Sequence, residues 1–267
     1  MTKKTPRKSL ITVSYNSVDA LGHFWNEREF DDLTEWIVVD NCSSDGSAEL
    51  AQELGARVVR LPKNVGFSAA NNAGLAAARG SFVGFVNPDV RIGANPIDQL
   101  ERIAQETGAI VGPQLLNPDG SAQPNGRGFP LLTAKVRNRL KGDDADYLLT
   151  SDGPQPFPVV WLMGAAVFGT REAVEKIHGW DSRFFIYYED SDFGLRAWKA
   201  GIPVLLAPQA TAVHGWARET SGRFRWAPWM REIASMTRFY SRYPELLLSY
   251  GVAKRAHPDI TEAVYSR

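Results

Sequence analysis

The sequence predicts an α/β protein, in which helices cover both faces of a parallel sheet. The first 112 residues contain short apolar runs rich in β-branched residues, and segments with helical periodicity separate these runs. Short buried strands that alternate with helices indicate parallel pairing, because each crossover helix must cover a face of the sheet. The composition, 44% hydrophobic and 22% charged over 267 residues, is typical of a soluble globular protein with an ample core.

The expected elements follow one another in a regular order. Strand signals lie at 9–15, 36–40, 56–61, 81–86 and 109–112. The segment SAELAQEL predicts a helix that ends at Gly55, and FSAANNAGLAAAR predicts one that ends at Gly80, since glycine is a common helix stop. The segment NPIDQLERIAQE predicts a third helix, with Asn95 as its cap and Pro96 at its first position.

Charge and cysteine content exclude several classes of protein. Thirty basic and thirty acidic residues cancel, so no overall field favours nucleic acid as a partner. The single cysteine, Cys42, excludes an internal disulfide and a cysteine metal cluster. The basic opening MTKKTPRK is not followed by an apolar region of signal length, and no run approaches eighteen apolar residues. We therefore expect a cytoplasmic location.

Polar residues follow three of the expected strands, where ligands of parallel sheets bind. Asn16 follows the first strand, the turn 40–47 follows the second, and 87–89 follows the fourth. The polar composition of 40–47 also fits a turn that caps the next helix. Asp40, at the strand end itself, is the better candidate to bind a ligand hydroxyl or base edge. Dinucleotide and P-loop sites are disfavoured, because GxGxxG does not occur here and GxxxxGK[ST] occurs nowhere.

The tripeptide Asn-Pro-Asp occurs twice, and its two contexts differ. At 117–119 it is followed by Gly120, which predicts a hairpin turn without a ligand. At 87–89 it follows the most apolar strand and has no hairpin partner. An Asn carbonyl and an Asp carboxylate two residues apart are hard oxygen donors, suited to Mg²⁺ or Mn²⁺ bridging a diphosphate.

A third polar feature is the segment FFIYYEDSDFGLRAWKAG at 184–201, which carries Glu189, Asp190 and Asp192. Acidic residues favour a helix N-terminus, and Asp192 is spaced to pair with Arg196 on the helix surface. The residues alone leave two interpretations open, an acidic helix start or a carboxylate that performs chemistry.

Five motifs in order resemble the inverting glycosyltransferases of family 2: ITVSYNS, IVVDNCSSDGS, NVGFSAANNAG, FVNPDV and GWDSRFFIYYEDSDFGLRAWKAG. The resemblance covers roughly residues 9 to 220. It implies a GT-A fold, with a Rossmann-like, mostly parallel sheet in a nucleotide-sugar half (1–112). An acceptor-binding and catalytic half (113–215) of the same domain and a C-terminal helical extension (216–267) would follow. A finer similarity, carried by GRGFP at 126–130, is to bacterial rhamnosyltransferases.

The resemblance also implies a role for individual residues. Asp190 matches the base that deprotonates the acceptor hydroxyl, and Glu189 and Trp161 match acceptor-binding positions, although a core aromatic is an equal alternative for Trp161. Asp89 and His214 match the metal-binding positions, with a structural histidine as the alternative. Asn87 replaces the more familiar first Asp of the metal motif and so removes a negative charge. The residues matching nucleotide-binding positions are Ser14, Tyr15, Asn16, Asp40, Asn72 and Asn87.

The chemistry of sugar transfer explains this set of residue types. A divalent metal stabilises a departing nucleotide diphosphate, and a carboxylate must take the proton of the attacking hydroxyl. We therefore expect a metal-dependent inverting enzyme using Mg²⁺ or Mn²⁺ and a dTDP- or UDP-sugar, with rhamnose a candidate sugar. Its acceptor would be a saccharide, free or lipid-linked, in cell-surface glycan synthesis. The alternatives are a nucleotidyltransferase and a non-catalytic sugar-nucleotide-binding protein.

Basic residues gather on the acceptor side of the sequence. The segment 121–141 contains five basic and no acidic residues, and 216–267 contains nine Lys or Arg against five Asp or Glu. The second segment also carries aromatic residues, namely Trp226, Trp229, Phe239, Tyr240 and Tyr243. Such a segment could lie on an anionic membrane at its inner face, or could be a helical pair with a solvated basic surface.

Overall fold

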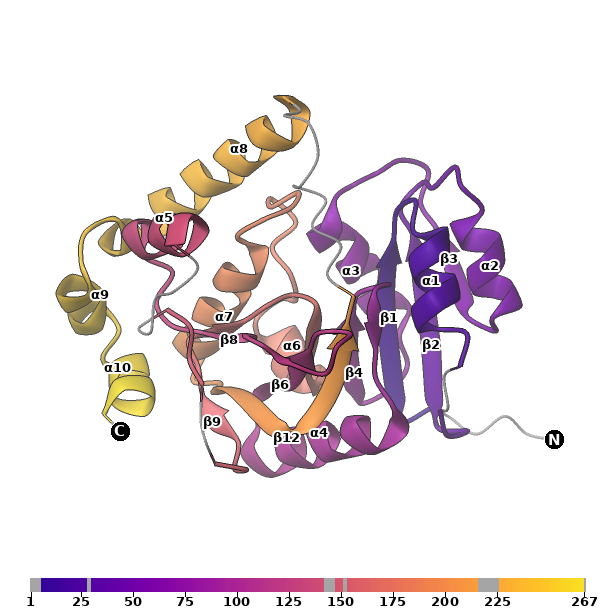
Figure 1. The fold of residues 1–267 in the computed structure, drawn as a ribbon, viewed down its shortest axis with the longest axis horizontal. Helices are drawn as coiled ribbons and strands as arrows, with labels where there is room; N and C mark the ends of the chain where they lie inside the picture. Colours follow the sequence, from indigo (N-terminus) through magenta and orange to yellow (C-terminus); the bar gives the residue numbers. More distant parts are fainter. Residues whose placement is uncertain (1–5, 28–29, 142–146, 151–152, 216–225, 267) are drawn as a thin grey trace.

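The fold centres on one continuous mixed sheet (Figure 1), seen in a computed structural model that describes residues 6–27, 30–141, 147–150, 153–215 and 226–266. Four parallel strands run in the order β3-β2-β1-β4, formed by β1 (Lys8–Ser14), β2 (Thr34–Asp40), β3 (Arg57–Arg60) and β4 (Phe82–Val86). The strand order reverses at β1, because β2 and β4 lie on its two sides. The carboxyl ends of β1 and β4 therefore meet at a topological switch point, where open α/β sheets bind ligands.

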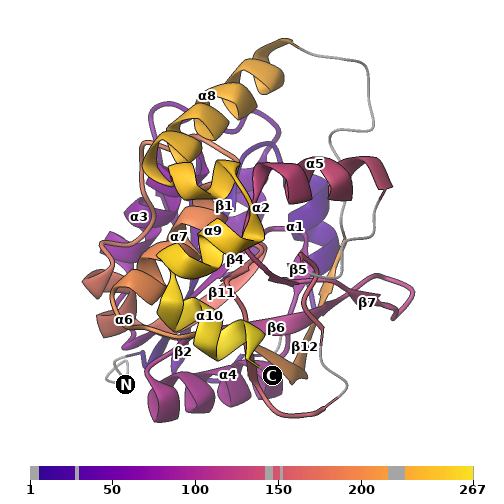
Figure 2. The same ribbon diagram turned by 90° about the vertical axis from the view of Figure 1, so that its left-hand side faces the viewer.

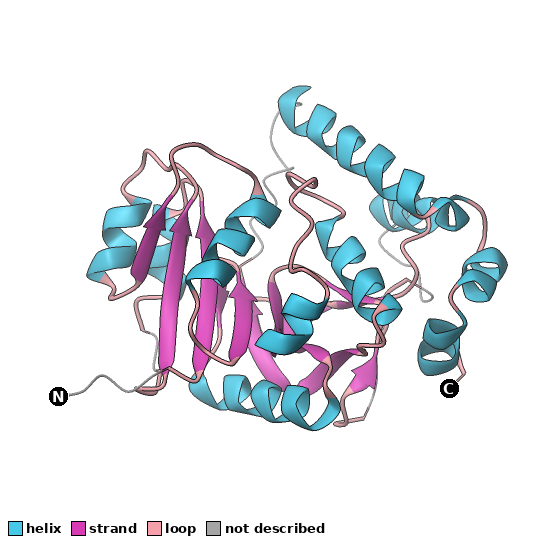
Figure 3. Cartoon of the chain, turned by 180° about the vertical axis from the view of Figure 1, so that it is seen from behind, coloured by secondary structure: helices cyan, strands magenta, loops and turns pink. Residues whose placement is uncertain are grey.

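The second half of the sheet is joined to the first by an antiparallel strand. Strand β11 (Ala166–Thr170) runs antiparallel to both β4 and β6 (Ile110–Leu116), and β12 (Val204–His214) pairs parallel with β6. Figure 3 shows these strands side by side from behind. The expected boundary at 112 falls inside β6, so the two halves share one sheet. The smaller strands are β5 (Val90–Arg91), β7 (Ala122–Gln123), β8 (Gly126–Arg127), β9 (Phe157–Pro158) and β10 (Trp161–Leu162).

Helices cover both faces of the sheet, as the sequence predicts. Helices α1 (Val18–Phe24), α2 (Ser47–Glu53) and α4 (Ala94–Thr107) contribute to a core on one face together with Leu10 and Val38. Helices α3 (Phe67–Ala77), α6 (Arg171–Lys176) and α7 (Glu189–Lys199) contribute to the core on the other face, with Ile11 and Val39. The adjacent strand residues alternate between the two cores, because successive side chains of a strand point to opposite faces.

Two details of the expected elements are corrected by the structure. Helix α4 begins at Ala94 after Gly93, so Asn95 is not its cap and Pro96 is not its first residue. The Asn95 side chain instead accepts a hydrogen bond from Gln99 at 3.4 Å. The hairpin at 117–119 is confirmed, because it joins the antiparallel strands β6 and β7 and Gly120 has a φ of 83°.

The C-terminal helices dock on the second half of the domain, 113–215 (Figure 2). They are α8 (Trp226–Arg242), a 3-10 turn (Pro244–Leu247), α9 (Tyr250–Ala256) and α10 (Pro258–Tyr265), and they lie beside α5 (Leu132–Lys141). The Tyr240 hydroxyl donates to the Pro130 carbonyl at 3.0 Å, and the Ser235 hydroxyl donates to the Ile186 carbonyl at 2.8 Å. Within the described part of the chain, no helix is both long and apolar enough to cross a membrane.

The aromatic residues of α8 do not form the interfacial surface that the membrane hypothesis requires. Phe239, Tyr240 and Tyr243 are all buried in the core. The side chains of Trp226 and Trp229 lie outside the described residues. The interpretation of 216–267 as a membrane-facing segment is therefore wrong for three of the five aromatic residues on which it rests.

Candidate active site

The ends of β1 and β2 bring together four of the expected nucleotide-binding residues. Ser14 and Asp40 are register neighbours at the last positions of their strands. The Asp40 carboxylate is buried and accepts the Ser43 N–H at 3.3 Å. Asn16 has a φ of 51° and accepts the Ser44 N–H at 2.9 Å, while Tyr15 is 51% exposed. These residues therefore form a polar cluster at the switch point of the sheet.

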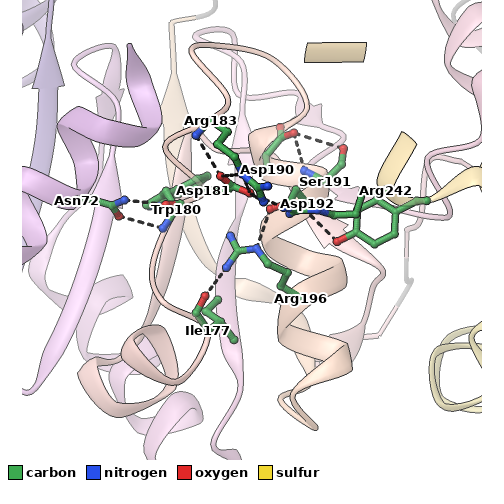
Figure 4. Close-up of polar contacts among 11 residues, drawn as sticks. Asn72, Ile177, Trp180, Asp181, Arg183, Asp190, Ser191, Asp192, Arg196 and Arg242 are labelled. Atoms are coloured by element: carbon green, nitrogen blue, oxygen red, sulfur yellow. Dashed lines mark hydrogen bonds and ion pairs between the residues drawn. The ribbon is translucent and has the colours of Figure 1, made fainter. Parts of the chain in front are cut away.

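Asn72 does not join this cluster. Its amide nitrogen donates to the Trp180 carbonyl at 2.6 Å, and its amide oxygen accepts the Trp180 N–H at 2.9 Å (Figure 4). Both ends of the side chain are thus engaged in holding the loop before α7 against α3. We do not carry Asn72 into the proposed nucleotide site.

The two expected metal ligands are neighbours at the end of β4. Strand β5 pairs with the end of β12, which places His214 opposite Val90. The His214 Nε2 atom lies 3.4 Å from Oδ2 of Asp89, and the Gly215 N–H donates to the Asp89 carbonyl at 2.8 Å. His214 is buried, whereas the Asp89 side chain is 26% exposed. The pair therefore has one open side.

This pair fits a divalent cation held partly by substrate. Among the described residues, no group of three or more His, Cys, Asp or Glu could hold a metal by itself. Mg²⁺ and related ions are commonly bound through one or two protein side chains plus water and substrate phosphates. Asp89 and His214 supply such an incomplete set. The backbone of Asn87 contacts the segment before β11, since its N–H donates to the Ala165 carbonyl at 2.9 Å.

The loop before α7 is held against the start of α3. The Phe67 N–H donates to the Phe185 carbonyl at 2.7 Å. A Cβ atom on Gly66 would lie 2.5 Å from that same carbonyl oxygen, so only glycine fits there. Tyr187 and Tyr188 then adopt φ values of 70° and 66°, which non-glycine residues rarely adopt. This turn delivers three acids into the first turn of α7.

The three acids occupy different environments. Glu189 is buried, and its Oε2 atom has no hydrogen-bond partner in the described structure. Burial, together with the neighbouring charge of Asp190, raises the pKa of Glu189 to about 8. Asp190 is half-buried and accepts the Ser191 N–H at 2.7 Å, and it forms no ion pair with a described residue. Asp190 is thus the acid that is available to a substrate.

Asp192 is not the surface residue that the sequence predicts. Its side chain is 0% exposed, and its pairing with Arg196, at 2.7 Å, is confirmed. It also forms an ion pair with Arg242 of α8 and accepts the Tyr243 hydroxyl at 3.1 Å (Figure 4). Burial raises the pKa of Asp192 in spite of the guanidinium groups. Losing this pair is therefore expected to cost more than the roughly 0.5 kcal/mol or less of an exposed i,i+4 pair.

Two cations of the basic segment 121–141 point inward. The Lys135 ammonium lies 3.8 Å from the centre of the Tyr188 ring and donates to the Ser191 hydroxyl at 3.2 Å. Burial lowers the pKa of Lys135 to about 8, against the opposing charges of Asp190 and Glu189. Arg127 is 9% exposed, and its Nε atom has no hydrogen-bond partner among the described residues. Positive charge therefore faces the acids of α7.

Lys135 could not be identified from a count of the charges along the segment, because such a count ignores which face of the helix each residue occupies. Leu131 and Ala134 are buried, and Lys135 follows them at positions i+4 and i+1. That spacing would have placed Lys135 on the apolar face. Trp161, by contrast, is a buried core aromatic whose Nε1–H donates to the Gly128 carbonyl at 2.9 Å. The core alternative describes its position.

One short loop lies between the Asp89–His214 pair and Asp190. This loop, 163–165, precedes β11. Its Ala165 carbonyl accepts the Asn87 N–H, and a Cβ atom on Gly164 would lie 3.7 Å from the Cβ atom of Asp190. The end of β4 and the start of α7 therefore border the same loop.

Glu189→Gln is expected to make folding stability less dependent on pH. The unfolded chain releases this proton near the ordinary value of 4.5, whereas the folded chain holds it to about pH 8. Since the folded state binds more protons in that window, this group lowers stability as pH rises from 4.5 to about 8, and no further above it. The Tm advantage of Glu189→Gln over wild type should therefore grow between pH 5 and pH 8. An advantage that is constant across this range, as expected for the exposed control Glu172→Gln, would contradict the assignment.

The fold and site define the class of GT-A glycosyltransferases, and solved structures share the fold. The structure of GalNAc-T7 with UDP, GalNAc and Mn²⁺ aligns with a TM-score of 0.63 at 16% identity, covering 97% of this chain and 54% of that one. The mannosyltransferase PcManGT from Pyrobaculum calidifontis, in complex with GDP-Man and Mn²⁺, aligns with a TM-score of 0.60 at 16% identity, covering 98% and 70%.

The chain belongs to glycosyltransferase family 2. The sequence model of Glycosyl transferase family 2 matches residues 9–156, and that of Glycosyl transferase family group 2 matches 129–251. The N-acetylglucosaminyl-diphospho-decaprenol L-rhamnosyltransferase of Mycobacterium tuberculosis is 31% identical over 207 residues, 69% of this chain and 67% of that protein. The low-salt glycan biosynthesis hexosyltransferase Agl10 of Haloferax volcanii is 27% identical over 222 residues, 77% and 66%. The protein is thus a glycosyltransferase that resembles bacterial rhamnosyltransferases.

Proposed function

We propose that the protein is a metal-dependent inverting glycosyltransferase, with Asp190 as the general base. The observation that supports this most is the position of Asp190, which forms no ion pair with a described residue, across the loop 163–165 from the turn that carries Asp89. A displacement reaction needs a base on the acceptor side and a charge clamp on the leaving-group side. The two groups border one loop from opposite elements, α7 and the end of β4.

On the donor side, the residues at the strand ends bind and orient. Asp40 and Ser14 contact the nucleoside, and Tyr15 and Asn16 line the same pocket. Asp89 and His214 would hold Mg²⁺ or Mn²⁺, which when bound would stabilise the charge on the departing diphosphate. The positions that Asp89 and His214 leave open suit phosphate oxygens.

On the acceptor side, Asp190 takes the proton of the attacking hydroxyl, and a single displacement inverts the anomeric centre. Glu189, whose pKa is raised to about 8, stays protonated at neutral pH and can donate a hydrogen bond from Oε2 to a saccharide oxygen. Lys135 places its ammonium group beside these acids, where it donates to the Ser191 hydroxyl. These residues divide the work between proton transfer and acceptor positioning.

We take the proposed substrates from the names of the two relatives. The Mycobacterium tuberculosis relative is named for L-rhamnosyl transfer to a lipid-linked N-acetylglucosaminyl diphosphate, and the Haloferax volcanii relative is named for glycan biosynthesis. We extend to this chain a dTDP- or UDP-sugar donor, with rhamnose as the first candidate, and a saccharide or lipid-linked saccharide acceptor in cell-surface glycan synthesis. Incubation with a panel of dTDP- and UDP-sugars and Mn²⁺ tests this. We expect slow diphosphate release from one donor, and no release from any would contradict the proposal.

Asp89→Ala is expected to abolish metal-dependent donor binding. The loss should appear in affinity before turnover, because the metal holds the diphosphate before chemistry begins. Titration calorimetry with UDP and dTDP, with and without Mn²⁺, measures it. The exposed control Asp32→Ala should keep the wild-type increase in affinity with Mn²⁺. An equal increase in Asp89→Ala would make 87–89 a simple turn like 117–119.

A further inference from the structure

A chain of side-chain hydrogen bonds runs from His214 to the hairpin at 117–121. The His214 Nδ1 atom lies 2.6 Å from Oε1 of Gln123. The Gln123 Nε2 atom donates to Oδ1 of Asn117 at 3.0 Å, and the Asn117 Nδ2 atom donates to the Ser121 hydroxyl at 2.9 Å. The Ser121 hydroxyl in turn donates to Oδ1 of Asp119 at 2.6 Å. The second Asn-Pro-Asp motif is therefore physically connected to the histidine beside the first.

The direction of this chain is fixed from its far end. An ionised carboxylate only accepts hydrogen bonds, and the hydrogen bonds from Ser121 hold the pKa of Asp119 below its ordinary value. The Ser121 hydroxyl must then donate to Asp119 and accept from Asn117 Nδ2. Each amide is thereby oriented in turn, so Gln123 presents its oxygen, not its nitrogen, to the histidine.

We propose that Gln123 is a positioning residue that sets the tautomer of His214 for metal binding. A Gln123 oxygen can only accept, so Nδ1 of His214 carries a proton, and in the neutral imidazole Nε2 then carries the lone pair. That lone pair faces the Asp89 carboxylate at 3.4 Å. Two acceptors at this distance repel each other unless a cation lies between them. The hairpin thus keeps the histidine in the form that binds a cation jointly with Asp89.

The burial of the chain supports a positioning role. Gln123 is 1% exposed and His214 is 4% exposed, so water does not readily substitute for either partner. A residue that holds the second nitrogen of a metal-binding histidine commonly changes metal affinity by about 10- to 100-fold when it is replaced. This inference rests on the proposed metal site, but the tautomer exists in the metal-free protein and can be measured there.

The first test is ¹⁵N NMR of the imidazoles in the metal-free protein. The chain has four histidines, and the His214 signals are those that disappear in His214→Asn. In the wild type, we expect a protonated Nδ1 and an unprotonated Nε2. In Gln123→Met, which keeps the side-chain length, the proton should move in part or fully to Nε2. Gln123→Glu keeps an acceptor and should keep the wild-type tautomer. An unchanged tautomer in Gln123→Met would overturn the inference.

The second test is the affinity for Mn²⁺ alone, measured by electron paramagnetic resonance. Gln123→Met should bind Mn²⁺ about 10-fold or more weakly, and Gln123→Glu should stay within about threefold of wild type. The matched control is Gln114→Met, because among the described residues the Gln114 amide donates to two backbone carbonyls, those of Leu115 and Gln123, and to no side chain of the proposed metal site. Equal affinities of wild type and Gln123→Met would overturn the inference.

Two further outcomes separate this inference from the proposed function. Wild-type protein that binds no Mn²⁺, either alone or in the presence of UDP or dTDP, would contradict the proposed metal site, while the NMR result would still decide the role of Gln123. If Gln123→Met does not fold, Asn117→Ala is the alternative variant. It removes the acceptor of the Gln123 Nε2 atom, so the Gln123 amide is free to turn over. It should give a smaller tautomer shift in the same direction, and the absence of any shift would overturn the inference.

Discussion

Asp190→Asn is expected to lower sugar transfer by about 10²- to 10⁴-fold, the usual contribution of general base catalysis. The variant should fold normally, because Asp190 forms no ion pair with a described residue and an Asn oxygen can still accept the Ser191 N–H. Donor affinity should also be unchanged, since the proposed metal-binding residues, Asp89 and His214, lie on other elements. Single-turnover transfer and calorimetry with the nucleotide diphosphate measure these two properties separately.

The control for this experiment is Glu172→Gln, which removes an exposed acid from the first turn of another helix, α6. It should leave transfer unchanged. Near-normal turnover in Asp190→Asn, or an equal loss in both variants, would falsify the assignment of Asp190 as the base. A loss of donor affinity in Asp190→Asn would instead indicate that this carboxylate acts in binding.

Asp192→Asn, two residues further on, is expected to destabilise the fold. The change removes the buried anion that Arg196 and Arg242 share, although Arg242 keeps its ion pair with Asp181 at 2.8 Å. Removing one partner of a buried ion pair costs about 3–5 kcal/mol, which lowers Tm by roughly 10 °C in a protein of this size. The raised pKa of Asp192 agrees with this view, because burial already makes the carboxylate costly and its partners offset that cost only in part.

Urea denaturation of Asp192→Asn and Glu175→Gln provides a matched comparison. Arg171 and Glu175 form an ion pair with the same i,i+4 spacing as Asp192 and Arg196, but the Glu175 side chain is 57% exposed. Its loss should cost roughly 0.5 kcal/mol or less. Equal destabilisation of the two variants would contradict this prediction, because it would mean that Asp192 contributes no more to stability than an exposed acid.

The first part of the fold could be predicted from the sequence because local patterns determine it. The apolar runs at 9–15, 36–40 and 81–86 became β1, β2 and β4, since a buried parallel strand has a continuous apolar signature. The antiparallel insertion of β11 between β4 and β6 has no such signature. It depends on which strand reaches the open sheet edge, a property of the whole chain.

The candidate site was predictable where a residue's neighbours in sequence are its neighbours in space. Asp40 and Asp89 follow their strands directly, so strand-end reasoning located them. Asp192 was misjudged because its second partner, Arg242, lies on α8 and cannot be seen from helical spacing. Gln123 was missed for the same reason, since only the pairing of β7 with β6 brings it near the end of β12.

The ion network at Asp192 has a consequence for how such enzymes diverge. The first turn of helix α7 carries both Asp190 and Asp192. Asp192 forms an ion pair with Arg242 and accepts a hydrogen bond from Tyr243, at the end of α8. An engineer might exchange the C-terminal helices between homologues to alter acceptor choice. Such an exchange would leave the buried Asp192 carboxylate without Arg242, unless both cations and the carboxylate were transferred together. We expect the start of α7 and the end of α8 to be inherited, and to be transplantable, only as one unit.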